Sequence, residues 1–156
     1  MLTIRVGPDA VAALRTACER AGVRETGGML FGAHVGGDEF SVVEATVHVV
    51  GRFASFVRVV TDGFARLDQF FRRTRRDYAR FNYLGEWHSH PSFALHPSST
   101  DDETMVDIVA DPTTRALFVV LIIVKLEEGV LRAGAWAYFP EAPRRTCRVL
   151  IEQRQS

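Results

Sequence analysis

The chain has 156 residues, of which 47% are hydrophobic and 24% are charged. This length and composition are typical of one folded domain and argue against a disordered segment. Nineteen basic residues balance nineteen acidic ones, so the chain lacks the positive field that draws proteins to nucleic acid or acidic lipid. We therefore expect one domain over residues 1–156 that binds neither nucleic acid nor membranes.

Signals for membrane insertion, secretion and disulfide bonding are missing from the sequence. The longest apolar run, at residues 116–124, is far shorter than the roughly 20 residues that a membrane-spanning helix needs. The first residues lack the basic stretch followed by a long apolar stretch that marks a secretory signal. Cys18 and Cys147 are too few for a disulfide framework or a thiolate zinc site. These features predict a cytoplasmic protein.

The first third of the chain predicts one helix followed by two strands. Apolar residues recur at helical spacing over 9–21, and Gly22 is suited to end that helix. The sequence at 28–33 predicts a short strand. A pair of glycines at 36–37 predicts a hairpin turn into a second strand at 39–50.

The remaining sequence predicts further strands and two more helices. An amphipathic stripe predicts a helix at 63–81, and Ser99 or Thr100 can cap a helix at 100–110. The unbroken apolar run at 116–125 predicts a buried strand. This order predicts an α/β or α+β fold in which helices cover a sheet. Other extended segments are expected at 54–60, 83–90 and 130–139.

Two histidines on one expected strand are the first chemical signal. His88 and His90 alternate on that strand, so both imidazoles project from one face and can hold one ion. Imidazoles and carboxylates are favoured zinc ligands, and Asp101, near the start of the predicted helix, can supply the third. Three protein ligands leave the fourth position to water, whose pKa zinc lowers to about 7. Taken alone, however, two histidines at this spacing arise easily by chance, and they could also be hydrogen-bonded core residues.

Two nearby residues compete with this assignment. His96 also follows the strand and could replace Asp101 as third ligand, but the adjacent Pro97 favours an exposed loop. Glu86 shares the strand face of the two histidines and could approach the metal. Trp87 alternates to the opposite face, where we expect it to pack in the core.

Five residues at fixed offsets make the pattern specific. His88-X-His90 is followed by seven residues and Ser98, then by two residues and Asp101, while Glu25 lies far upstream in the sequence Glu-Thr-Gly-Gly. This arrangement resembles the JAMM motif of JAB/MPN metalloproteases, and the Glu-Thr-Gly-Gly setting is that of bacterial members. The resemblance implies a single MPN/JAB-like domain with a mixed central sheet flanked by helices.

The resemblance covers residues 7–139 and implies a peptidase with one zinc ion (Zn2+) per chain. The two histidines and Asp101 would hold zinc, which acts as a Lewis acid and activates water. Glu25 would take a proton from that water and return it to the leaving amine, and Ser98 would stabilise the oxyanion. Glu25 is preferred over Glu86 as the base because only Glu25 occupies a motif position.

The resemblance also implies a class of substrate. Members of the family remove ubiquitin or ubiquitin-like proteins from lysines, trim precursor tails, or cut small peptide adducts. The sequence around the histidines looks most like bacterial JAB proteins encoded beside ubiquitin-like activating and conjugating enzymes in antiphage operons, CBASS systems among them. The implied substrate is a ubiquitin-like protein or its conjugate, cleaved after a terminal glycine. Its tail would lie extended along a sheet edge, and the activating and conjugating enzymes are implied partners.

The sequence leaves three questions open. A peptidase of small peptides and a metal-free MPN-like scaffold are alternatives, although a scaffold is expected to lack a ligand and this sequence lacks none. Segments 50–62 and 102–115 are shorter than the inserted loops of ubiquitin-specific eukaryotic members, which argues against strong linkage selectivity. Arginines crowd the predicted helix at 63–81, either as a solvated face or as a docking patch for an acidic partner. These are Arg66, Arg72, Arg73, Arg75, Arg76 and Arg80.

Overall fold

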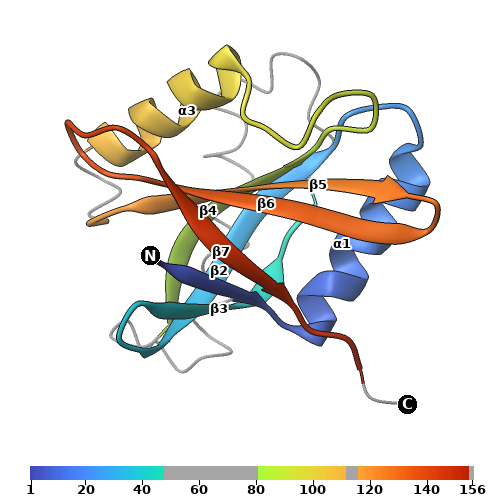
Figure 1. Ribbon diagram of the computed structural model, residues 1–156, viewed down its shortest axis with the longest axis horizontal. Coiled ribbons are helices and arrows are strands. Elements are labelled where there is room, and N and C mark those ends of the chain that lie inside the picture. The colour runs from blue at the N-terminus through green and yellow to red at the C-terminus, as the bar shows by residue number, and fades with distance from the viewer. Residues whose placement is uncertain (48–80, 112–115, 155–156) are drawn as a thin grey trace.

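A computed structural model describes residues 1–47, 81–111 and 116–154, and its strands form a closed barrel (Figure 1). The strand order around the barrel is β1-β3-β2-β4-β5-β6-β7. The expected strand at 54–60, and the expected helix at 63–81 with its arginines, lie outside the described residues. The strands are β1 (Thr3–Val6), β2 (Gly27–Gly36), β3 (Glu39–Ala45), β4 (Phe81–Ser89), β5 (Val119–Glu127), β6 (Val130–Tyr138) and β7 (Arg145–Ile151).

The barrel has mixed strand directions, as expected for the α+β class. β4 pairs in parallel with β5, and β1 pairs in parallel with both β3 and β7, while the other neighbours are antiparallel. Neither β1 nor β7 was predicted from the sequence, and the pairing of these two strands closes the ring. Among the described strands none ends the sheet, so the expected sheet edge for a substrate tail is not provided by an end strand.

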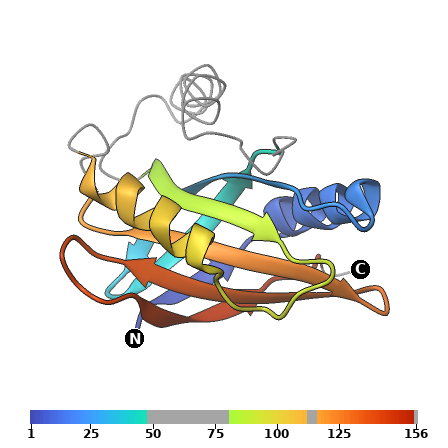
Figure 2. The same ribbon diagram turned by 90° about the horizontal axis from the view of Figure 1, so that it is seen from above.

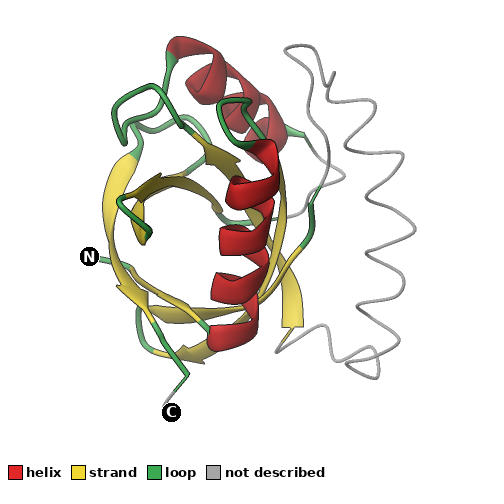
Figure 3. Cartoon of the chain, turned by 90° about the vertical axis from the view of Figure 1, so that its right-hand side faces the viewer, coloured by secondary structure: helices red, strands yellow, loops and turns green. Residues whose placement is uncertain are grey.

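Two helices, α1 (Pro8–Ala21) and α3 (Ser99–Ala110), pack on different sides of the described barrel. Figure 3 shows α1 across one opening, where its apolar face joins the interior core with Ile4, Leu30 and Trp87. α3 packs on the outer face of β5 and β6 (Figure 2). In the described part of the chain, neither helix is long and apolar enough to cross a membrane.

The alternation of side chains along β5 explains how one strand packs in two apolar clusters, the interior core and a second cluster between the barrel and α3. Val120, Ile122 and Val124 face the interior core, whereas the alternate residues face α3. This two-sided burial is the reason for the unbroken apolar run in the sequence. Because β4 is the parallel neighbour of β5, its side chains divide between the same two faces. The residues that face α3 are Val119, Leu121 and Ile123.

Candidate active site

The end of β4 and the residue that follows it place two histidines beside α3. His88 is the partner of Ile123 in the parallel pairing, and Ile123 packs against α3, so the imidazole of His88 faces that helix. Trp87 is the partner of Ile122 and is fully buried in the interior core, as predicted. His90 follows the last residue of β4, and its backbone N–H donates to the carbonyl of Val124 at 2.9 Å.

The start of α3 supplies the carboxylate and the serine. Ser98, and not Ser99 or Thr100 as predicted, is the N-cap of α3, because its backbone is extended and its Oγ accepts a 3.1 Å hydrogen bond from the N–H of Asp101. The Ser98 N–H donates in return to Oδ2 of Asp101 at 2.8 Å. This reciprocal pair is a capping box, with aspartate in the position that glutamate or glutamine often holds. The Ser-X-X-Asp spacing therefore orients Asp101 as well as capping the start of the helix.

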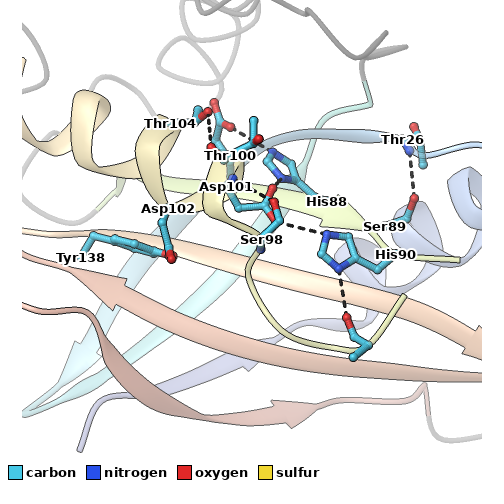
Figure 4. A network of polar contacts seen from close by, with 12 residues as sticks. Thr26, His88, Ser89, His90, Ser98, Thr100, Asp101, Asp102, Thr104 and Tyr138 are labelled. Carbon is cyan, nitrogen blue, oxygen red and sulfur yellow. Dashed lines mark hydrogen bonds and ion pairs between the residues drawn. The ribbon is translucent and has the colours of Figure 1, made fainter. Parts of the chain in front are cut away.

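His88, His90 and Asp101 converge at this point (Figure 4). Nδ1 of His88 lies 2.8 Å from Oδ1 of Asp101, and Nε2 of His90 lies 3.2 Å from Oδ2. Nδ1 of His90 is 3.0 Å from the carbonyl oxygen of Ala94 and donates its proton to that oxygen. The structure thus brings together three side chains that the sequence separates by up to 13 residues.

Opposite charges hold this group together. Burial alone would lower the pKa of His88, but hydrogen bonds to Asp101 and Glu86, together with their negative charges, raise it to about 9. Burial would raise the pKa of Asp101, but the hydrogen bonds from His88 and from the Ser98 N–H hold it well below its usual range. In this arrangement a protonated imidazole faces an ionised carboxylate. The site therefore favours a positive charge next to Asp101.

The donor set fits zinc by its chemistry. Two imidazoles and one carboxylate are ligands that zinc prefers, and a carbonyl accepting the second ring N–H, as Ala94 does from His90, is typical of metal-binding histidines. Within the described ranges, no three His, Cys, Asp or Glu side chains are grouped as they would be around an ion. His88 and His90 instead each contact Asp101, and metal ligation would exchange those contacts for bonds to the ion.

Glu25 immediately precedes a residue that pairs with the end of β4. Thr26 and Ser89 bond to each other twice: the Thr26 N–H donates to Ser89 Oγ at 2.9 Å, and the Ser89 N–H donates to the Thr26 carbonyl at 2.8 Å. These bonds continue the β2–β4 pairing and place Glu25 beside the strand end that leads to His90. The Glu25 side chain is exposed and makes no hydrogen bond or ion pair with the histidines or with Asp101.

The glycines after Glu25 have a steric role. Gly27 is the direct partner of His88 across the β2–β4 pairing. A Cβ on Gly27 would lie 2.6 Å from the Trp87 carbonyl oxygen and 3.0 Å from Cδ2 of His88. A Cβ on Gly28 would lie 1.8 Å from the Thr46 carbonyl oxygen. The two glycines therefore allow β2 to approach its neighbours closely beside the histidine.

Glu86 contacts the site, whereas His96 does not contact the other candidate ligands. The Glu86 carboxylate is buried, with 5% of the residue exposed, and its Oε2 lies 3.3 Å from Nε2 of His88. The alternation of β4 had indicated this approach. Nε2 of His96 instead faces the guanidinium of Arg144 at 3.0 Å, and its ring meets that of Trp136 edge-on. Sequence reasoning did not identify the Ala94 carbonyl or Arg144, because no local pattern marks either one.

Comparison with known proteins found a matching family model and a similar protein. Residues 8–137 match the family model described as prokaryotic homologs of the JAB domain. A protein of Enterobacter hormaechei subsp. hoffmannii (strain UCI 50), named CD-NTase/cGAS isopeptidase, is 30% identical over an alignment of 131 residues that covers 79% of this chain and 67% of that protein.

Two solved structures share the fold. A solution structure from Desulfitobacterium hafniense matches with a TM-score of 0.68 and 17% identity, covering 97% of this chain and 94% of that one. A solution structure from Salinibacter ruber (strain DSM 13855) matches with a TM-score of 0.54 and 18% identity, covering 95% and 91% of the two chains. At these identities the likeness extends to the fold alone.

Proposed function

The chain belongs to the prokaryotic homologues of the JAB domain, and on that basis we propose that it is a zinc-dependent isopeptidase. It would hydrolyse the bond after the C-terminal glycine of a ubiquitin-like protein, either in a conjugate or in a precursor. The convergence of His88, His90 and Asp101 at 2.8 and 3.2 Å carries this proposal. Two imidazoles and a carboxylate leave one tetrahedral position of zinc free for water, which suits a catalytic rather than a structural site.

The roles of the residues follow from their positions. Zinc, when bound, supplies a Lewis acid and lowers the pKa of a water molecule to about 7. Glu25, exposed beside the strand end that leads to His90, takes the proton of the attacking water and returns it to the leaving amine. Ser98 accepts a hydrogen bond from Asp101 with its oxygen, which leaves its hydroxyl proton free to stabilise the oxyanion.

The name of the Enterobacter relative supports the substrate class. That protein is named an isopeptidase of CD-NTase/cGAS. We therefore propose that the conjugated target here is a nucleotidyltransferase of that kind, in a bacterial antiphage operon that also encodes the activating and conjugating enzymes. A tail that ends in glycine suits this chemistry because glycine has no side chain to obstruct access to the metal.

Metal analysis and a cleavage assay test the proposal. Purified chain should contain one zinc ion per molecule. It should release a reporter protein joined to the C-terminal glycine of a ubiquitin-like protein, and a chelator should abolish the release. The Glu25→Gln variant, expected to retain zinc, is the matched inactive control. Absence of zinc together with absence of cleavage would contradict the proposal, and cleavage of short peptides but not of the fusion would assign a small-peptide substrate instead.

A further inference from the structure

A second polar cluster adjoins the candidate site at the start of α3, where Asp102 follows Asp101. It consists of Asp102 on α3, Tyr138 at the end of β6, Arg144 just before β7, and His96 in the loop that precedes α3. The Tyr138 hydroxyl donates to Oδ1 of Asp102 at 2.6 Å, and the Arg144 guanidinium bonds to Oδ2. The other end of that guanidinium donates to Nε2 of His96 at 3.0 Å.

These contacts hold both ends of the segment that carries the site residues. His96 and Asp102 flank residues 97–101, and this short stretch contains Ser98 and Asp101. A single guanidinium bonds to both flanking residues, so it limits movement of one end relative to the other. The planar, multi-donor guanidinium is suited to such a bridge, whereas an ammonium group is a point charge on a flexible stem.

Both oxygens of the Asp102 carboxylate are paired within the cluster. Asp102 is adjacent to Asp101, and the positive charge of Arg144 compensates the second carboxylate. Burial, the hydrogen bond to Asp102 and its negative charge all raise the pKa of Tyr138 well above its usual range, so the phenol stays protonated and donates. Asp102 therefore has a hydrogen-bond donor on each oxygen. Asp101 contacts the two histidines and the Ser98 N–H instead of this cluster.

We propose that Arg144 is a positioning residue that, through Asp102 and His96, holds Ser98 and Asp101 in place for metal binding and catalysis. This inference rests on the proposed function. Arg144 lies beyond residues 8–137, which match the family, so the support comes from a part of the chain outside that match. Supporting hydrogen bonds of this kind typically change metal affinity about 10- to 100-fold when they are removed.

The test compares variants of the full chain in zinc affinity, measured by competition with a chromophoric chelator, and in kcat and KM for the fusion substrate. Arg144→Ala should lower zinc affinity at least about 10-fold and lower kcat, with KM changed less than about twofold. Arg148→Ala, an exposed arginine of β7, is the matched control and should behave as wild type. Arg144→Lys should fall between the two because lysine can pair with Asp102 but cannot bridge to His96.

Two further variants separate positioning from folding. His96→Gln keeps an acceptor for Arg144 and should retain zinc affinity, whereas His96→Ala should lower it. Hydrogen exchange of the metal-free chain should be faster over residues 96–102 in Arg144→Ala than in wild type. If Arg144→Ala lowers the melting temperature but leaves zinc affinity, kcat and exchange unchanged, the contact only stabilises the fold and the inference is wrong. A wild type without zinc or cleavage would instead refute the proposed function, and the exchange result would still decide whether Arg144 orders the segment.

Discussion

Substitution of Ser98 separates two roles of one hydroxyl: the helix cap that the structure shows and the oxyanion contact that we propose. Ser98→Ala removes the acceptor for the Asp101 N–H, but the reciprocal bond from the Ser98 N–H to the carboxylate of Asp101 does not need the hydroxyl. Loss of an N-cap serine costs about 1 kcal/mol of unfolding free energy. For a domain of this size the melting temperature should fall by about 2–4 °C. The fold and the position of Asp101 should therefore persist.

The effect on hydrolysis should be much larger. If the Ser98 hydroxyl donates to the oxyanion, its loss should lower kcat about 10²- to 10³-fold, or roughly 2.7–4 kcal/mol of activation free energy. A stability loss of about 1 kcal/mol cannot produce this change, because a domain with an unfolding free energy of roughly 5–15 kcal/mol stays folded. The two magnitudes are far enough apart to be measured separately.

The assay pairs thermal melting and zinc titration with single-turnover cleavage of the fusion substrate. Ser98→Gly is the control, because glycine at an N-cap costs only a few tenths of a kcal/mol while also lacking the hydroxyl. Both variants should lose the same factor in rate and keep zinc, and only Ser98→Ala should melt measurably lower. A rate within about threefold of wild type in both variants would show that Ser98 is a helix cap without a catalytic role.

Further predictions concern the base, the glycine and the metal. Glu25→Gln should retain zinc and lose at least about 10²-fold in kcat, whereas Glu86→Gln should remain active; the opposite result in the cleavage assay would make Glu86 the base. Gly27→Ala should lower the unfolding free energy by about 1–3 kcal/mol in denaturant titration, because its Cβ would lie 2.6 Å from the Trp87 carbonyl oxygen. Wild-type stability in that titration would show that β2 can move away. Zinc at about 100 times its dissociation constant should raise the melting temperature by roughly 5–11 °C, and Asp101→Asn should remove most of that rise; an equal rise in both proteins would exclude Asp101 as a ligand.

The features that could be predicted from sequence are those with a local geometric cause. Alternation along a strand predicts that His88 and His90 lie on one side, and both contact Asp101 although His90 lies one residue beyond β4. Three-residue spacing at a helix start joins Ser98 to Asp101. The two-sided burial of β5 is likewise visible as an apolar run. The predicted N-cap, Ser99 or Thr100, lies one or two residues after the observed N-cap, Ser98. All three residue types are good caps, and only the backbone conformation distinguishes them.

The amino-acid sequence by itself determined which residue types could hold a metal and which of them would share a strand face or a helix turn. Tertiary structure alone decided that β1, with only four residues, and β7 pair with each other from opposite ends of the chain and close the barrel. It also decided that Glu86 is buried against His88 while Glu25 is exposed, and that Arg144 bridges His96 and Asp102. Such pairings depend on contacts between residues far apart in sequence, and no periodicity or spacing within one segment encodes them.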